Sequence, residues 1–237
     1  MKLRGFTEIW LVDFEYTAFP GHHPTPIVMV ARELISGRVL RLAADALLGL
    51  RAAPFDTGPD SLFVAYYASA EFSCFLVLGW ELPVNVIDLF AEFRNIHNGL
   101  ETPFGRNLLG ALLWFGFPPG DAVEKIEMRL LAIRGGPFTD PEITAWMEYC
   151  QSDVEALAKL WTVMAPLLDA SALLRGRYMK AAALMEWAGI PLDTRTHGQL
   201  EKRWDDFKDH LIHEIDPTGT VWRKGKFSVR RFVCDDN

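Results

Sequence analysis

Residues 9–15 read IWLVDFE, a run of bulky apolar side chains that ends in two carboxylates separated by one residue. Successive side chains of a β-strand point to opposite faces, so Asp13 and Glu15 lie on the same face of the predicted strand. Two neighbouring carboxylates in an apolar setting repel each other and lose solvation, and divalent cations offset both costs. The pattern indicates a candidate metal site, but a strand end with two solvated acids explains it as well.

The segments on either side of Asp13 predict a sheet that the chain then covers with helices. Five stretches have the composition and length of strands: residues 8–16, 26–34, 38–42, 62–65 and 84–87. The dipeptide Ser36-Gly37 predicts a hairpin turn between the second and third of them. Helical patterns occupy four further stretches: residues 70–78, 107–116, 123–133 and 141–161. Three antiparallel strands followed by alternating helices and strands predict an α/β fold with a mixed central sheet flanked by helices.

A second chemical pattern lies in the last of these helices. Tyr149 and Asp153 are four residues apart, so they share one helix face. A phenol one turn before a carboxylate can hold the water that a metal bound by that carboxylate activates, as phosphodiester hydrolysis requires. A tyrosine packed beside a solvated aspartate is the alternative reading of this pair alone.

Taken together, these residues resemble motifs of the DEDD 3′–5′ exonucleases, most closely the proofreading domain of Pol I-like (family A) DNA polymerases. Asp13 and Glu15 match the first motif, and Tyr149 with Asp153 matches the third. The histidine subclass carries a histidine five residues before the last aspartate, where this chain has Glu148, so the tyrosine subclass is favoured. The family has a ribonuclease H-like (DnaQ-like) exonuclease fold, which is therefore the fold that we expect.

The second motif departs from the family pattern. Its aspartate position holds Glu71, and its asparagine position holds Tyr67. A glutamate keeps the charge and adds one methylene, so it can reach a cation directly or through water. Asp88, at the end of the fifth predicted strand, is the rival ligand, but its position resembles that of a strand-end aspartate found in relatives.

The resemblance implies a two-metal mechanism with Mg²⁺ or Mn²⁺. Asp13 would bridge both cations, Glu15 and Asp153 would complete the site of the hydrolytic one, and Glu71 would support the other. Tyr149 would position the attacking water, because a phenol with a pKa of about 10 is a poor base at neutral pH. The resemblance also implies substrate contacts from four residues: Phe14, Tyr67, Lys125 and Arg129.

The likeness continues beyond the nuclease motifs. Residues 177–193 resemble the segment that opens the polymerase region of family A enzymes, and a long helix is predicted from Thr196 or Gln199 to about Ile215. Polymerase motifs do not follow, so we expect no polymerase activity. We expect an exonuclease domain over residues 1–170 and a small helical appendage over residues 171–237.

Composition is compatible with this assignment. The 237 residues are half hydrophobic, which suffices for one substantial core and an appendage. A formal charge of −7 argues against broad duplex binding, but not against holding a few nucleotides of a single-stranded end. The sparse cysteines are Cys74, Cys150 and Cys234, and no apolar run of about 18 residues occurs, so we expect a soluble cytoplasmic protein without a membrane partner.

The sequence therefore predicts a 3′–5′ exonuclease that removes nucleotides from single-stranded or frayed DNA ends. Three alternatives stay open at this point. The chain could trim RNA as a ribonuclease D-like enzyme, or it could be a weakened nucleic-acid-binding module, for which Glu71 and Tyr67 are the motive. It could also be an inert structural domain that serves a separate polymerase.

Overall fold

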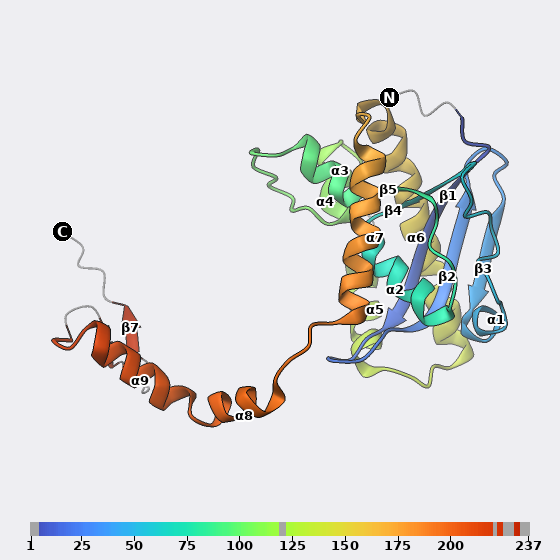
Figure 1. Cartoon of the computed structure of the whole chain (residues 1–237). Helices are drawn as coiled ribbons and strands as arrows, with labels where there is room; N and C mark the ends of the chain where they lie inside the picture. Colours follow the sequence, from blue (N-terminus) through green and yellow to red (C-terminus); the bar gives the residue numbers. More distant parts are fainter. Residues whose placement is uncertain (1–4, 119–121, 220–221, 225–229, 233–237) are drawn as a thin grey trace. The chain divides into compact units, whose positions relative to one another are not determined.

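The computed structural model describes residues 5–118, 122–219, 222–224 and 230–232 (Figure 1). The chain forms two compact units, Met1–Gly189 and Ile190–Asn237. The strands of the described residues are β1 (Glu8–Thr17), β2 (Thr25–Glu33), β3 (Val39–Ala43), β4 (Ser61–Ala65), β5 (Asn85–Asp88), β6 (Trp222–Lys224) and β7 (Arg230–Phe232). The helices are α1 (Ala44–Leu48), α2 (Ala68–Leu78), α3 (Leu89–Ile96), α4 (Leu108–Trp114), α5 (Ala122–Arg134), α6 (Asp140–Met164), the 3₁₀ turn η1 (Ala165–Leu167), α7 (Ala172–Ala188), α8 (Thr194–Lys202) and α9 (Trp204–Ile215).

A five-stranded sheet with the order β3-β2-β1-β4-β5 forms the centre of the first unit (Figure 1). β1 pairs antiparallel with β2 and parallel with β4, while β2 pairs antiparallel with β3 and β4 parallel with β5. Every bound of these strands falls within one residue of the sequence-based prediction. The predicted mixed sheet flanked by helices is thus confirmed.

Helices cover both faces of this sheet and create two separate cores. On one face, Leu11 of β1 packs with Trp146 and Leu160 of α6 in one buried cluster. On the other face, Val12 of β1 belongs to a cluster with residues of α2 and α7. Figure 1 shows α6 behind the sheet and α2 and α7 in front of it. The alternation along β1 therefore assigns Asp13 and Glu15 to the α6 face and residues 12 and 14 to the α2 face.

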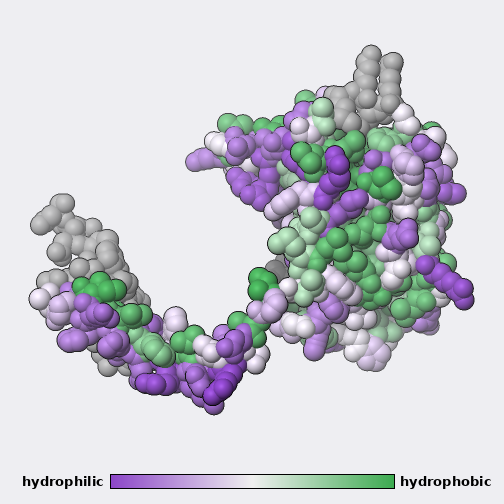
Figure 2. Space-filling model, viewed as in Figure 1, coloured by the Kyte–Doolittle hydropathy of each residue, from purple (hydrophilic) through white to green (hydrophobic). Residues whose placement is uncertain are grey.

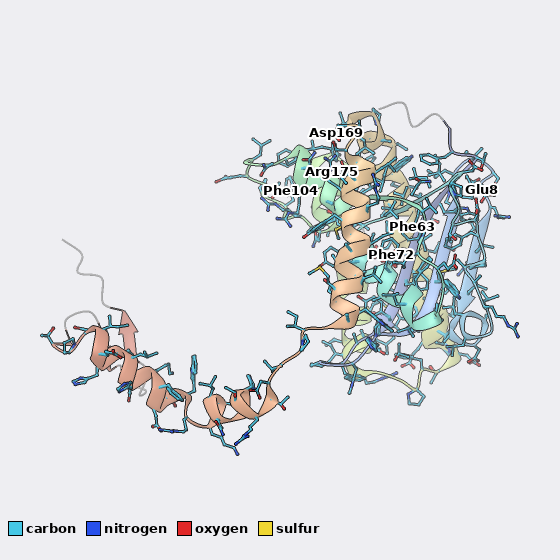
Figure 3. The ribbon with its side chains drawn as sticks, in the orientation of Figure 1. Glu8, Phe63, Phe72, Phe104, Asp169 and Arg175 are labelled. Atoms are coloured by element: carbon cyan, nitrogen blue, oxygen red, sulfur yellow. The ribbon has the colours of Figure 1, made fainter. Side chains whose placement is uncertain are left out.

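Aromatic rings fill the core between α2 and the sheet. Phe63 of β4 and Phe72 of α2, both labelled in Figure 3, have ring centroids 5.2 Å apart. Phe75 of α2 makes an edge contact with Phe63 at 5.7 Å. Interlocked rings bury much apolar area and prefer such tilted and edge-to-face arrangements. α2 is thereby fixed on the sheet, and with it the residues in its first turn.

α7 is part of the first unit and lies directly against β5 and α2. A Cβ atom at Gly176 would lie 1.9 Å from the backbone oxygen of Val86, so the helix backbone touches the strand. Arg175 donates hydrogen bonds from Nε and Nη2 to the buried carboxylate of Glu92, at 2.6 and 2.7 Å. Figure 3 shows Arg175 on α7 beside Asp169, which accepts a further bond at 2.7 Å. These contacts carry the first compact unit to Gly189, whereas a division at residue 170 was expected from the sequence.

The second unit contains α8, α9 and the antiparallel pair β6–β7. Asp193 caps α8, because its carboxylate accepts hydrogen bonds from the backbone N–H groups of Arg195 and Thr196. The single long helix predicted to end near Ile215 is divided at Arg203, whose φ of −117° lies outside the helical region. The strand pair β6–β7 was not predicted. None of the described helices is both long and apolar enough to cross a membrane.

Candidate active site

β1 projects beyond its parallel neighbour at the end that carries the carboxylates. Its pairing with β4 ends at Leu11 opposite Val64, while its pairing with β2 continues through Asp13 and Glu15. A register shift between Glu15 and Tyr16 marks a β-bulge just after them. Both carboxylates therefore stand at an edge that β4 leaves open, and their side chains remain partly accessible to solvent.

α6 brings the third carboxylate to this edge. The helix begins with a capping box, in which Thr139 and Glu142 satisfy each other's backbone N–H groups, and its apolar stripe packs on the sheet. Asp13, Glu15 and Asp153 each offer one oxygen atom within 4.8 Å of the other two. The first and third sequence patterns, whose nearest members Glu15 and Tyr149 are 134 residues apart in the chain, are therefore joined in space by the fold.

Cys150 reinforces this junction, because its Sγ–H donates to the backbone oxygen of Asp13 at 3.3 Å.

Tyr149 lies beside Asp153, as the four-residue spacing predicts. Burial raises the pKa of its phenol, and the charges of Asp153, Glu15 and Asp13 raise it further, as does its hydrogen bond to the Asp153 carboxylate. The phenol therefore keeps its proton at neutral pH and donates it to Asp153. It can orient a neighbouring molecule, but it is no base.

Glu71 lies in the first turn of α2 and is 4% exposed. Burial raises the pKa of its carboxyl well above the ordinary value, and the charges of Asp13 and Glu15 raise it further. The backbone N–H of Phe14 donates a hydrogen bond that opposes this shift. Its Oε2 atom is buried without a hydrogen-bond partner among the described residues. Glu71 thus lies outside the group of three carboxylates but close enough for the charges of Asp13 and Glu15 to affect its pKa.

Asp88, the rival ligand, has a different task in the structure. Its carboxylate accepts backbone hydrogen bonds from Ala68 at 2.7 Å, Ala91 at 3.0 Å and Tyr67 at 3.3 Å. It therefore caps α3 and also holds the first residues of α2. Asp88 is 1% exposed and does not belong to the carboxylate group. The structure favours Glu71 over Asp88 as the acid that faces the cluster.

The four residues expected to contact substrate differ in their exposure and in whether their side chains are described. Phe14 is 3% exposed, and its ring packs against Phe75 and Trp80, so the prediction that its side chain contacts substrate is corrected. The reason is strand alternation, which turns residue 14 away from its two acidic neighbours. Tyr67 is 44% exposed, and its φ of 74° is unusual for a bulky residue. The side chains of two further expected contacts lie outside the described residues: Lys125 and Arg129.

Two residues near the carboxylates were not singled out from the sequence. Burial raises the pKa of the Tyr16 phenol, and the charge of Glu71 raises it further, so this side chain also borders the acidic group. Burial likewise raises the pKa of the Cys150 thiol. The bulge that redirects the chain at Tyr16 has no sequence signal. The place of Cys150 in the apolar stripe of α6, four residues after Trp146 and four before Val154, could have indicated that it faces the sheet.

The donor atoms suit a hard divalent cation. Mg²⁺ and Mn²⁺ prefer carboxylate oxygens, and three such oxygens within 4.8 Å match that preference. The buried Oε2 of Glu71 adds an oxygen for which the described protein offers no donor. These residues therefore fit a metal centre, with no sulfur or imidazole in the group of three.

Solved structures share this fold. RNase D from Escherichia coli, described as an exoribonuclease involved in structured RNA processing, is 18% identical with a TM-score of 0.51 over 75% of this chain and 45% of that one. The catalytic core of RRP6 from Trypanosoma brucei is 14% identical with a TM-score of 0.52 over 88% and 59%. A Trypanosoma brucei RNase D in complex with RNA U12 is 13% identical with a TM-score of 0.50 over 74% and 61%.

These likenesses show the fold of the chain. The protein spans about half the length of these neighbours, between 45% and 61%. No protein-family model matches the sequence, and no curated protein matches it. The chain thus shares the α/β fold of these RNase D and RRP6 structures, while its resemblance to DEDD exonucleases and family A polymerases stays a prediction from the sequence.

Proposed function

We propose that the first unit is a divalent-metal-dependent exonuclease that removes nucleotides from single-stranded or frayed 3′ ends. The observation that carries this proposal is the group formed by Asp13, Glu15 and Asp153, whose oxygens lie within 4.8 Å of one another. Tyr149, which donates to Asp153, supplies the polar group expected beside such a site. The shared fold of solved exonucleases is compatible with this activity.

The residues have distinct roles in the proposed hydrolysis. Asp13, Glu15 and Asp153 would hold the cations, with Glu71 reaching the second position from α2. Bound Mg²⁺ or Mn²⁺ supplies positive charge to the attacking and leaving oxygens of an in-line displacement. The phenol of Tyr149 donates its hydrogen bond to Asp153, so its oxygen can still accept a hydrogen bond from a water molecule and thereby orient that water.

RNA is the second candidate substrate, and one observation favours it. Two of the neighbours that share the fold are an exoribonuclease and a protein solved in complex with RNA U12. The DNA reading rests on the resemblance of residues 177–193 to the opening of a family A polymerase region. Under that reading, the protein would edit DNA ends, alone or beside a separate polymerase.

The decisive experiment uses single-stranded DNA and RNA that carry a label at either end, with Mg²⁺, Mn²⁺ or EDTA. A 3′–5′ exonuclease shortens the 5′-labelled strands stepwise and releases labelled mononucleotides from the 3′-labelled ones. Asp13→Asn and Asp153→Asn should lower the rate by several orders of magnitude, whereas Glu148→Gln, an exposed acid on the same helix, should not. Cleavage by Asp13→Asn at the wild-type rate would overturn the assignment.

A catalytically weakened module remains the alternative if the wild type cleaves neither nucleic acid. That protein would still bind labelled single strands in Ca²⁺, while showing no shortening in Mg²⁺ or Mn²⁺. The substitution Glu71→Asp would then restore cleavage, if the longer side chain at that position is the defect. No cleavage and no binding would reject both readings.

A further inference from the structure

A pocket of about 310 Å³ lies in the first unit between α3, the segment after it, and α7. Its lining combines arginines, asparagines and aromatic rings, and it includes no acidic residue. The residues that matter for the argument are Phe90, Arg94, Asn98, Arg106, Arg175 and Tyr178. In Figure 2, strongly hydrophilic residues gather where α7 passes this region. Cationic and amide donors beside aromatic faces are the groups that bind the phosphates and bases of nucleic acids.

The arginines of the pocket are not equivalent. Arg175 is committed to Glu92 and Asp169, so its charge is already neutralised within the fold. Arg94 is exposed, and its guanidinium lies 5.5 Å from the ring centroid of Phe90. Within the described part of the chain, Arg94 makes no ion pair. The pocket therefore holds positive charge that the fold itself does not use.

A chain of contacts joins this pocket to the candidate active site. Tyr67, at the start of α2, packs edge-on against Phe90 with ring centroids 5.1 Å apart. Asp88 accepts hydrogen bonds from the starts of both α2 and α3, so one carboxylate positions the helix of Glu71 and the helix of Phe90. Glu71, whose pKa is raised by burial and then by the charges of Asp13 and Glu15, lies in the first turn of α2. Tyr67, directly before that helix, contacts the pocket residue Phe90.

Tyr178 adds a stacking surface on the α7 side. Its side chain is 70% exposed, although it lines the pocket. An exposed ring next to unpaired positive charge has no structural use in the fold, because it buries little apolar area. Such a ring offers a face on which a nucleobase of any sequence can stack.

We propose that the pocket between α3 and α7 binds an upstream nucleotide of the strand whose 3′ end lies at the carboxylate group. Arg94 contacts a phosphate of that nucleotide, and Tyr178 stacks on its base. This inference rests on the proposed function, since it deepens the site to include a second subsite on α7. With this second subsite, the protein should bind strands that are long enough to reach from the carboxylates to α7 more tightly than shorter ones.

The proposal predicts a length dependence that the variants abolish. Arg94→Ala and Tyr178→Ala should each weaken binding of a labelled single-stranded 12-mer about tenfold, as loss of one stacked or ion-paired unit implies. Binding of a dinucleotide, too short to span both places, should not change. Arg94→Ala should also reduce the slope of log K against log salt by about 0.7, the value for one single-strand phosphate contact.

The experiment measures fluorescence anisotropy of labelled DNA and RNA in Ca²⁺, with melting temperatures recorded for every variant. Arg94→Lys tests whether charge alone restores binding. The matched controls are Arg51→Ala and Leu48→Ala, two exposed residues near the opposite, β3 edge of the sheet. The controls should bind every strand as the wild type does.

Two outcomes overturn the inference. Wild-type affinity of both pocket variants for the 12-mer would exclude the subsite, and so would equal weakening by the two controls. If a free nucleoside monophosphate competes with the 12-mer only in the wild type and binds as tightly as the strand, the pocket is a mononucleotide site instead. Failure of the proposed function gives a different result, because the wild type then cleaves no strand while the pocket variants still lose affinity for the 12-mer.

Discussion

Asp13→Asn removes the charge at the centre of the carboxylate group while keeping the size of the side chain. Burial raises the pKa values of Glu71, Tyr149 and Tyr16, and the charge of Asp13 raises all three further. Without a cation, its interactions with Glu15 and Asp153 are repulsive. We therefore expect the substitution to stabilise the metal-free protein.

The size of the effect follows from the separation. At 4.8 Å, two unit charges interact by about 3.5 kcal/mol with an effective dielectric constant of about 20, and by about 0.9 kcal/mol in bulk water. Asp13 repels two such neighbours, but solvent reaches all three side chains, which places the effect toward the lower value. We expect the free energy of unfolding in EDTA to rise by about 1–3 kcal/mol.

Metal should reverse this order of stability. A ligand at about one hundred times its dissociation constant stabilises the folded state by about 2.7 kcal/mol. Wild type should gain this amount with Mn²⁺, while Asp13→Asn should gain little, because a ligand is lost. The assay is urea denaturation of both proteins in EDTA, Ca²⁺ and Mn²⁺, with Glu148→Gln as the control for charge on α6.

The control should resemble wild type in all three solutions, because Glu148 is exposed and does not belong to the carboxylate group. A lower stability of Asp13→Asn in EDTA would show that repulsion does not dominate the metal-free site. An undiminished response of that variant to Mn²⁺ would refute the reasoning more deeply, because the cation would then bind elsewhere.

Three further predictions test other parts of the structure. Glu71→Ala should lose most of the cleavage activity, and Glu71→Asp should keep or increase it. The wild type should cleave faster with Mn²⁺ than with Mg²⁺, because Mg²⁺ demands stricter octahedral geometry. Single-turnover cleavage rates measured in each metal test both expectations. Gly176→Ala should destabilise the protein by several kcal/mol, because its Cβ meets the backbone of β5, whereas Gly198→Ala, with nothing within 4 Å, should be neutral or slightly stabilising in thermal unfolding. Burial raises the pKa of the Glu33 carboxyl, but hydrogen bonds from the backbone N–H groups of residues 9, 36 and 35 outweigh burial and lower the pKa to about 2. About 3 kcal/mol of stability that is present above pH 4.5 should therefore be lost as the pH falls toward 2. In acid denaturation, Glu33→Gln should lose this pH dependence.

The central sheet was predictable because its signals are local, whereas the meeting of Asp13 and Glu15 with Asp153 was expected only from the family resemblance. The hairpin, the buried run before Asp13 and the four-residue spacing of Tyr149 and Asp153 are each read from fewer than about twenty residues. The burial of Phe14 was predictable in the same way, since alternation already turned it from the face of Asp13. Its expected substrate contact came from the family resemblance and ignored that alternation.

Other features depend on contacts that no local pattern encodes. The docking of α7 requires Gly176 to meet β5, about ninety residues earlier in the chain. Tyr67 adopts a left-handed conformation although nothing in its side chain favours it, and the surrounding hydrogen bonds to Asp88 hold it there. The break of the last long helix at Arg203 lacks a proline or glycine, so sequence gave no reason to place it.

The packing of α7 limits how this nuclease-like unit can be exchanged between proteins during evolution. α7 was expected from the sequence to open a polymerase-like region, yet it covers the aromatic core and supplies Met179 and Ala183 to it. A recombination event that cut the gene before α7 would leave that core uncovered and the buried Glu92 without Arg175. Junctions after Gly189 would leave the unit whole, so any shuffled descendant should carry α7 along with the sheet.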